Sequence, residues 1–197
     1  SFEKSENEKL ILKEAKKLFS KKGFHETTTR DIAKATKMAT GTLFNYFPSK
    51  EALVMKFVID ATQKAKSEYL SKRSGNESIE EDLFAHIAIT LRHVRPYRKF
   101  LIGVLEIVFS PFIKPGLFDE AEKFRTEHLE LVQEMIQNHK IDEVDSCDQD
   151  SFVIYHLYWT LYQGILSYWL KDNSPKQEDT LVLVDQYTRL FVSHLYS

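Results

Sequence analysis

Apolar residues recur at helical spacing along most of the chain. The first amphipathic segment carries them on one face, at Ile11, Leu12, Ala15, Leu18 and Phe19. This i, i+3, i+4 repeat is typical of a helix that buries one side. Gly23 is a typical residue to end such a helix. Similar periodicity continues toward the C-terminus and predicts an all-α fold.

Capping residues and prolines divide the chain into about nine helices. Thr28 with Asp31, and Ser78 with Glu81, have the spacing of a capping box, in which the first hydroxyl accepts a backbone N–H of the helix. Pro96 suits the first turn of another helix. The first predicted helix ends near residue 22. The next six span about 29–36, 39–46, 50–72, 78–95, 96–109 and 117–138.

Two more helices complete the predicted set. Ser146 with Gln149 caps a long helix that reaches residue 171. Ser174, Pro175 and Gln177 are interpreted as the N-cap, N1 and N3 residues of the last helix, which ends near residue 195.

The composition supports long helices with few connections. The 197 residues include six glycines and five prolines, less than half of the average usage of about 12%. Sandwiches, barrels and βαβ folds need more turns of that kind. The hydrophobic fraction of 43% and the charged fraction of 28% fit a globular protein with a sizeable core and exclude a disordered chain.

Two features bear on where the protein works. Cys147 is the single cysteine, which excludes an intrachain disulfide framework and a multi-cysteine zinc site and suits a reducing cytoplasm. The most apolar stretch, residues 100–109, contains Glu106 and is shorter than the roughly 20 residues of a membrane-spanning helix. We therefore expect a cytoplasmic protein with no membrane partner.

Charge is divided unevenly along the chain. Residues 1–75 carry 16 Lys and Arg against 9 Asp and Glu, a net charge of +7, whereas residues 76–197 carry 11 against 20, a net charge of −9. A basic end on an acidic body favours a polyanionic partner, with nucleic acid as the first candidate. The alternative is a chance distribution of charge over helical surfaces.

The basic segment also contains a recognisable motif. Two short helices joined by a tight turn follow a longer amphipathic helix, which indicates a helix-turn-helix. The residues read G-F-x-x-T-T-x-x-D-I-A from Gly23, and G-T-L-x-x-x-F-x-S-K-E-x-L from Gly41. On this motif, the stretch 18–53 resembles the DNA-binding domain of the TetR family of bacterial repressors.

The resemblance implies a domain organisation and a function. Residues 1–50 would form the helix-turn-helix domain, followed by a linking helix at about 50–72, and residues 76–197 the ligand-binding and dimerisation domain. The expected partners are double-stranded DNA with a palindromic operator, a second copy of the chain, and a small effector that releases the DNA. No cofactor is expected.

Residues around the motif are candidates for DNA contact. Arg, Asn and Thr can read base edges in the major groove, whereas helix N-termini, Tyr and Lys can hold phosphates. Gly41 would let the recognition helix approach the duplex closely, while Leu43 and Phe47 must face the core. The candidate DNA-binding residues are Thr28, Arg30, Lys37, Thr40, Gly41, Thr42, Phe44, Asn45, Tyr46 and Lys50.

Three positions depart from the family pattern. Phe44 stands where the family usually has Tyr, so a phosphate-contacting hydroxyl is missing there. Lys37 replaces the usual turn glycine, and a left-handed backbone there would cost about 1 kcal/mol or more. Ala39 replaces the usual Ser or Thr N-cap, a loss of about 1 kcal/mol.

The C-terminal part holds most of the aromatic residues. The helix up to residue 171 is apolar nearly all round and must be buried on more than one side. In the family, the last two helices pair with their mates in a four-helix dimer interface, and Gly164 could mark a close helix crossing. We expect an apolar and aromatic pocket between the helices at about 97–109, 117–138 and 148–171, suited to a hydrophobic or aromatic effector. Its candidate residues are Phe100, Val104, Phe124, Tyr158 and Tyr162.

No catalytic constellation is found in the sequence. A phosphate-binding glycine loop, a nucleophile elbow and an H-E-x-x-H zinc motif are all missing, and the histidines are interpreted as ordinary core or surface residues. The prediction is a dimeric DNA-binding transcriptional regulator, a repressor, and not an enzyme. Alternatives are an effector-free chromosome-organising protein of the same fold and an all-α enzyme.

Overall fold

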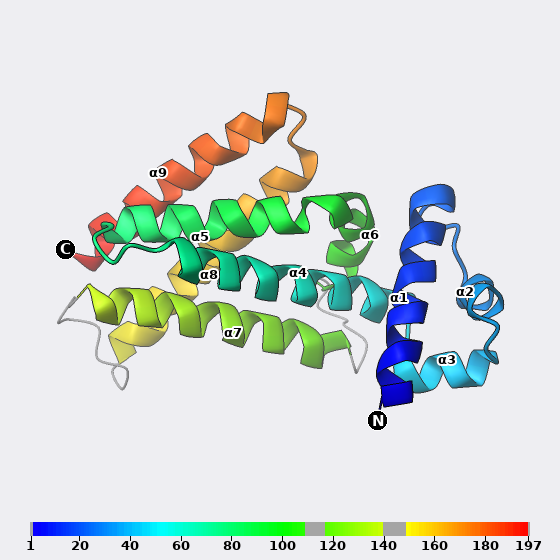
Figure 1. Ribbon diagram of the computed structural model, residues 1–197. Coiled ribbons are helices and arrows are strands. Elements are labelled where there is room, and N and C mark those ends of the chain that lie inside the picture. Colours follow the sequence, from blue (N-terminus) through cyan, green and yellow to red (C-terminus); the bar gives the residue numbers. More distant parts are fainter. Residues whose placement is uncertain (1, 109–116, 140–148, 197) are drawn as a thin grey trace. The chain divides into compact units, whose positions relative to one another are not determined.

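The computed structural model describes residues 2–108, 117–139 and 149–196 (Figure 1). In this part of the chain there are nine α-helices, two short 3₁₀ turns and no strand, so the predicted all-α fold is confirmed. The helices are α1 Phe2–Lys22, α2 Thr29–Thr36, α3 Thr40–Tyr46, α4 Lys50–Lys72, α5 Ile79–Val94, α6 Arg98–Val108, α7 Leu117–Asn138, α8 Gln149–Lys171 and α9 Glu178–Leu195. None of the helices in the described ranges is long and apolar enough to cross a membrane.

The helices divide into two compact units. Residues 1–60 with 94–123 form the first unit, and residues 61–93 with 124–197 form the second. The division falls inside α4 and near the start of α7, so each of these helices contributes to both units. The sequence-based boundaries at residues 50 and 76 treat α4 as a separate linking helix, and they remain a prediction.

The first unit is built on the amphipathic face of α1. Ile11, Ala15 and Phe19 are almost fully buried, as their spacing predicts. The Phe19 ring lies 5.3 Å from that of Phe24 and 5.5 Å from that of Phe100 on α6. The aromatic cluster therefore joins α1, the turn before α2, and α6.

The second unit has a core of helices far apart in the sequence. The second half of α4 runs beside α5 and α7 (Figure 1), and α8 packs on α9. Gly164 lies at the α8–α9 crossing, where an added Cβ would be 3.4 Å from the Tyr187 ring. A Cβ at that distance would make an ordinary van der Waals contact, so the close crossing expected at this glycine stays a prediction.

A buried carboxylate ties three helices of the second unit together. Asp82 is 1% exposed and accepts hydrogen bonds from the Tyr69 hydroxyl at 2.7 Å, the Arg73 guanidinium at 2.7 Å and the His139 ring at 2.9 Å. These partners come from α4, from the residue just after it, and from the end of α7. Because a buried charge is tolerated only with such partners, Asp82 fixes how these elements meet.

The start of the last helix differs from its prediction. Pro175–Gln177 form a separate 3₁₀ turn, with Lys176 and Gln177 in the left-handed region at φ 52° and 61°, and α9 begins at Glu178. The carboxylate of Asp172 accepts from the backbone N–H of Thr180 at 3.0 Å. Asp172, the residue after α8, therefore shares the capping of α9 with Ser174, whose hydroxyl accepts from Asp179 N at 3.1 Å. The predicted cap at Ser146 lies outside the described residues.

Candidate nucleic-acid interface and ligand cavity

The start of α2 has the capping box that its sequence predicts. The Thr28 hydroxyl accepts from Asp31 N at 3.1 Å, and the Asp31 carboxylate accepts from Thr28 N at 3.0 Å. Hydrogen bonds from Thr28 and from the Lys22 ammonium lower the pKa of Asp31 to about 2. Thr28 and Arg30 are exposed beside this cap, so both are available to an outside partner.

The turn between α2 and α3 uses a left-handed residue. Lys37 has φ 57° and ψ 31°, and its backbone N–H and that of Met38 close the end of α2 on carbonyls of Lys34 and Ala33. The left-handed conformation expected at Lys37 is confirmed. Ala39 is the N-cap of α3 and makes no side-chain capping bond, so the recognition helix lacks the cap that Ser or Thr supplies.

Helix α3 separates a buried side from an exposed one. Leu43 and Phe47 are 1% and 7% exposed, as predicted for the residues that anchor the helix. The other candidate residues of this segment lie at the surface or are half-buried: Lys37, Thr40, Gly41, Thr42, Phe44, Asn45 and Tyr46. A seven-residue helix with one anchored side presents a row of short polar groups and the Phe44 ring to solvent.

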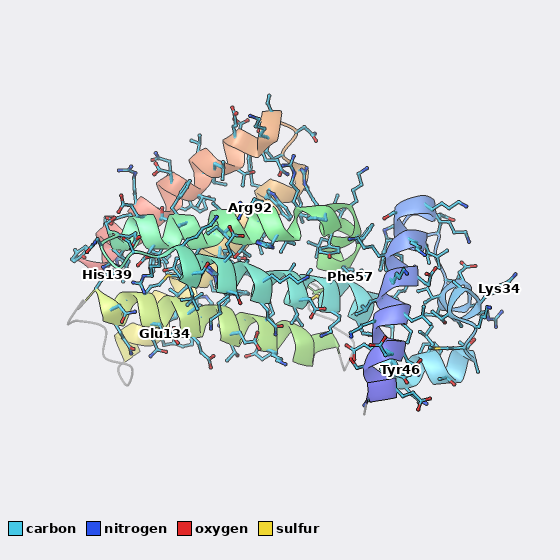
Figure 2. All side chains as sticks on the ribbon, in the orientation of Figure 1. Lys34, Tyr46, Phe57, Arg92, Glu134 and His139 are labelled. Carbon is cyan, nitrogen blue, oxygen red and sulfur yellow. The ribbon has the colours of Figure 1, made fainter. Side chains whose placement is uncertain are left out.

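Tyr46 is fixed by a residue that the sequence did not point to. Its hydroxyl accepts a hydrogen bond from the Asn7 amide at 3.0 Å, which joins the end of α3 to the first turns of α1 (Figure 2). The hydroxyl keeps its own proton for another acceptor. No local sequence pattern predicts this pair, because the two residues are 39 positions apart.

The Lys50 side chain is held within the protein. Its ammonium donates to the backbone carbonyls of Phe24, His25 and Thr27 at 2.8, 3.2 and 3.0 Å, and it lies 4.6 Å from the centre of the Phe24 ring. An ammonium has three N–H donors, so these carbonyls satisfy all of them. The phosphate-anchor role predicted for Lys50 competes with this arrangement.

Helix α6 lies against the turn that leads into α2. A Cβ added to Gly103 would be 2.8 Å from Nε2 of His25 and 3.0 Å from the Phe24 ring. A side chain at this position would require the His25 and Phe24 rings to shift, so the glycine lets α6 lie close to the turn before α2.

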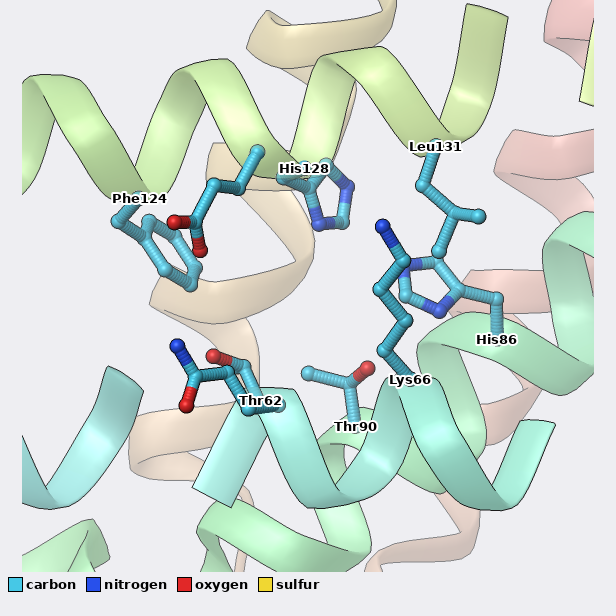
Figure 3. A pocket seen from close by; sticks show the side chains of 9 residues that line it. Thr62, Lys66, His86, Thr90, Phe124, His128 and Leu131 are labelled. Atoms are coloured by element: carbon cyan, nitrogen blue, oxygen red, sulfur yellow. The ribbon is translucent and has the colours of Figure 1, made fainter. Parts of the chain in front are cut away.

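A cavity opens in the second unit between α4, α5 and α7 (Figure 3). It is small, with about 40 Å³ of space open to a water-sized molecule. Its lining mixes polar and apolar side chains from the three helices: Thr62, Gln63, Lys66, His86, Thr90, Phe124, Glu127, His128 and Leu131. Figure 3 shows Lys66, His86, Thr90 and His128 pointing into the same space.

Two buried residues of this lining lack hydrogen-bond partners. His86 is 4% exposed and Thr90 is 2% exposed, and neither the two ring nitrogens of His86 nor the Thr90 hydroxyl has a partner. Burial, helped by the nearby Lys66 charge, lowers the pKa of His86 to about 4. Its ring is therefore neutral near pH 7, with one N–H donor and one acceptor.

His128 connects the cavity to α8. Its Nε2 lies 3.0 Å from the Tyr158 hydroxyl, and its ring stacks on that of Tyr162 with centroids 4.1 Å apart. The Tyr158 ring in turn meets Phe191 of α9 edge to face at 5.2 Å. Burial, with the neighbouring His86, holds the pKa of His128 well below its usual value.

The residues predicted for the effector pocket are distributed over several places. Phe124 lines the cavity just described, whereas Tyr158 and Tyr162 line a smaller apolar one between α5, α8 and α9. Phe100 and Val104 are buried in the first unit and line neither cavity. That all five residues line a single pocket therefore remains a prediction.

The sequence did not single out Lys66, Thr90 or His128 as cavity residues. His86 and Thr90 are four positions apart on one face of α5, which is the one local signal available. Their meeting with Lys66 depends on tertiary packing. Within the described ranges, no group of three or more His, Cys, Asp or Glu side chains is placed to hold a metal ion.

The geometry of α2, α3 and the turn between them defines a class of protein. A short anchored helix with exposed Thr and Asn side chains, preceded by a capped helix and a tight turn, is a helix-turn-helix module of the DNA-binding type. Here it is joined to a separate helical unit that contains a small cavity with polar and apolar side chains in its lining.

Comparison with known proteins identifies the family. Residues 11–56 match the model of the bacterial regulatory proteins of the tetR family, and residues 83–197 match that of the tetracyclin repressor-like C-terminal domain. The chain therefore belongs to the TetR family.

Individual relatives are distant. The chain is 30% identical over 96 residues to the regulator YuxN of Bacillus subtilis, which covers 49% of this chain and 33% of YuxN. It is 25% identical over 127 residues to the regulator UidR of Escherichia coli K12, covering 64% and 61%. The chain thus spans a third and about three fifths of these two curated relatives.

A solved structure of similar fold is the FadR repressor of Thermus thermophilus in complex with lauroyl-CoA. It has a TM-score of 0.74 and 20% identity, and the match covers 94% of this chain and 93% of that one. At this identity the likeness supports the fold alone.

Proposed function

We propose that the protein is a homodimeric transcriptional repressor that binds a palindromic operator through α2 and α3 and releases it when a small molecule occupies the α4–α5–α7 cavity. The observation that carries the DNA-binding half is the exposed side of α3 over buried Leu43 and Phe47. The C-terminal tetracyclin repressor-like match supports the effector half.

The exposed residues divide into two roles on DNA. Thr40, Thr42 and Asn45 can reach base edges, where Thr contacts a thymine methyl and Asn reads adenine. Arg30 in the first turn of α2 can read guanine. These four positions carry sequence preference, and the exposed Gly41 lets the backbone come close to the duplex.

A second set of residues holds the DNA backbone. Thr28 and the free N–H groups at the start of α2, an eight-residue helix, suit a phosphate. The Tyr46 hydroxyl still has its proton while Asn7 occupies a lone pair, so it can donate to a second phosphate. Lys37 adds charge, and Phe44, 44% exposed, can pack on a sugar or a thymine methyl.

Helix α4 supports coupling between ligand and DNA. It brings Lys50 to the carbonyls before α2 and Thr62 and Lys66 to the cavity wall. A ligand that binds one position of this helix better than another shifts the population of DNA-binding states. The two recognition helices of the dimer then no longer match successive major grooves.

The cavity favours a ligand-responsive regulator over an effector-free chromosome-binding protein. Buried polar groups are nearly always hydrogen-bonded, and unpartnered ones in a recess indicate a site that something else completes. The long acyl chain named with the FadR repressor needs an extended apolar channel, whereas this recess has only about 40 Å³ of space open to a water-sized molecule. We therefore expect a smaller effector than lauroyl-CoA.

The dimer would form through α8 and α9. Exposed apolar side chains gather on these helices, among them Tyr168 at 45%, Val182 at 61% and Leu190 at 59%. Such a concentration is more than the scattered apolar residues of an ordinary surface. A second copy of the chain is the occupant that the family supplies, since a two-fold operator requires two recognition helices.

The DNA-binding proposal is tested by selecting sites from a randomised duplex pool and measuring affinity by fluorescence anisotropy. Asn45→Ala should weaken binding to the selected site about tenfold or more while leaving scrambled DNA unchanged. Asn76→Ala, at an exposed asparagine in the loop after α4, is the matched control and should bind as the unmutated chain does. Equal binding by all three proteins would overturn the assignment of α3.

The dimer proposal is tested by light scattering at micromolar concentration. Leu190→Glu should give monomers or aggregates, because a charge is placed in an apolar contact. Leu70→Glu changes a similarly exposed leucine on α4 and should leave the dimer intact. A monomer from the unmutated chain contradicts the proposal.

A further inference from the structure

We propose that the α4–α5–α7 cavity takes a small organic acid, whose carboxylate is held by Lys66, His86 and Thr90. This inference rests on the proposed function, because it names the class of effector for that site. It is carried by two buried side chains, His86 and Thr90, whose polar atoms have no partner in the described protein, and by Lys66, which lines the same recess.

The unpartnered polar atoms of His86 and Thr90 favour a ligand with a polar atom. His86 and Thr90 are more than nine-tenths buried, and each leaves polar atoms without a partner. An unsatisfied buried donor or acceptor destabilises the fold by the full cost of removing it from water. A ligand that accepts from the His86 N–H and the Thr90 O–H would restore both bonds at once.

Lys66 determines which charge the ligand should carry. It is half-buried, points into the cavity beside His86 (Figure 3), and makes no ion pair within 4 Å in the described ranges. An ammonium next to two neutral donors favours an acceptor that carries negative charge. A cationic ligand would instead place two like charges in a partly desolvated recess.

The opposite wall limits the ligand to one acidic group. Glu127 lines the same cavity and would repel a second carboxylate, while it can accept from a hydroxyl or amide elsewhere on the ligand. Phe124 and Leu131 offer apolar contact. A single carboxylate on a compact, partly apolar body fits this arrangement better than a phosphorylated or polyacidic compound.

Ligand contact at this site reaches α8 and α9 through packed side chains. The His86 ring lies 5.1 Å from the His128 ring, which is bonded to Tyr158 and stacked on Tyr162. An acid bound to His86 is therefore connected through His128 to α8, one of the two helices proposed for the dimer interface.

The experiment uses fragments that need no knowledge of the natural effector. Acetate, propionate and benzoate are compared with acetamide, propionamide and benzamide at neutral pH and constant ionic strength. Binding to the full-length protein is followed by the imidazole NMR signals of His86, assigned with His86→Gln. Small fragments bind weakly, so concentrations extend to roughly 100 mM. We expect saturable shifts with the acids and binding by the amides that is about tenfold weaker or less.

Two variants connect the result to the named residues. Lys66→Met should weaken acid binding about tenfold, since it removes the charge and keeps the stem, and Thr90→Val should weaken it less. Lys64→Met changes an exposed lysine on the same helix and should leave binding unchanged. The inference is overturned if acids and amides bind alike, if Lys66→Met has no effect, or if no acid shifts His86 in this range.

The outcome separates the inference from the proposed function. If neutral compounds release operator DNA while the acids do not bind, the ligand class is wrong and the ligand-responsive repressor remains. If the acids bind through Lys66 but neither they nor their larger analogues release the operator, the cavity is a carboxylate site and its regulatory role is wrong.

Discussion

Polar side chains have opposite surroundings in the α2–α3 segment and in the α4–α5–α7 cavity. Around α2 and α3 they are satisfied by other groups of the protein, as in the Thr28–Asp31 cap and the Asn7–Tyr46 pair, or they face solvent. In the cavity, His86 and Thr90 are buried without partners. The difference suits a surface that meets a large polyanion from outside and a recess that encloses a small molecule.

The same contrast holds for how the two regions are stabilised. The α1–α3 segment depends on caps and on the Lys50 ammonium bound to three carbonyls. The body depends on Asp82, which gathers partners from residues 69, 73 and 139. The first region is thus held together by an ammonium on backbone carbonyls, whereas the second depends on side chains that come from several helices.

The largest effect should come from breaking the network of the body. Asp82→Ala leaves the Arg73 charge and the Tyr69 hydroxyl without their partner, and we expect the free energy of unfolding to fall by about 3–5 kcal/mol. Urea denaturation measures it. Asp185→Ala removes a carboxylate from an exposed pair with Arg189 and should change little. Equal effects of the two variants would show that burial of Asp82 does not matter.

Acid should destabilise the cavity region more than the DNA-binding segment. The pKa of His86 is lowered from 6.5 to about 4, so below pH 6.5 the unfolded chain takes up a proton that the folded chain does not bind. Stability is therefore full above pH 6.5 and falls as the pH decreases toward 4, by about 3 kcal/mol. Lys66 and His128 near the ring act in the same direction, because added positive charge disfavours the imidazolium. His86→Phe should flatten the pH dependence of unfolding, and an unchanged dependence would contradict the burial of a neutral ring.

Lys50→Ala distinguishes a structural role from a phosphate contact. Loss of three charged hydrogen bonds should lower the stability of the first unit by about 2 kcal/mol, and the slope of DNA affinity against salt should stay the same. Lys34→Ala, at an exposed lysine of α2, is the control and should not affect stability. If the salt slope instead decreases by about 1 with stability intact, Lys50 contacts a phosphate.

The smallest effect is expected at the turn before α3. Lys37→Gly removes a side chain from a left-handed residue at φ 57°, and the stability should rise by about 1 kcal/mol. The same replacement at Lys34, inside the helix, should lower it by about 1 kcal/mol. Thermal unfolding of both variants measures the difference, and a loss of stability at both positions would argue against strain at Lys37.

The sequence was informative wherever a short pattern determines the geometry. The two capping boxes and the left-handed Lys37 follow from residues within a few positions of each other, and the structure has all three. The start of α9 was predicted too early, because a 3₁₀ turn precedes the helix and Asp172, eight positions before Thr180, caps it together with Ser174. Capping carboxylates at that distance have no fixed sequence spacing, so the sequence alone does not reveal this one.

The cavity was harder to predict for the same reason. Lys66, His86 and His128 come from three helices, and single histidines on helices are usually core or surface residues. The aromatic residues of α8 suggested an apolar pocket, but Tyr158 and Tyr162 pack on His128, so their rings cover one side of a polar residue. Residues that meet only through tertiary packing leave no periodic pattern in the sequence.

Occupation of the cavity should control DNA binding by α3. Compounds that raise the melting temperature of the unmutated chain but not of Lys66→Met provide the direct test, in which the Kd for the selected operator is measured at saturating compound. Because coupling between sites is typically 5- to 150-fold, we expect the operator Kd to rise about tenfold or more, and Lys66→Met to show no such change. An operator Kd that stays constant while the compound is bound would contradict it.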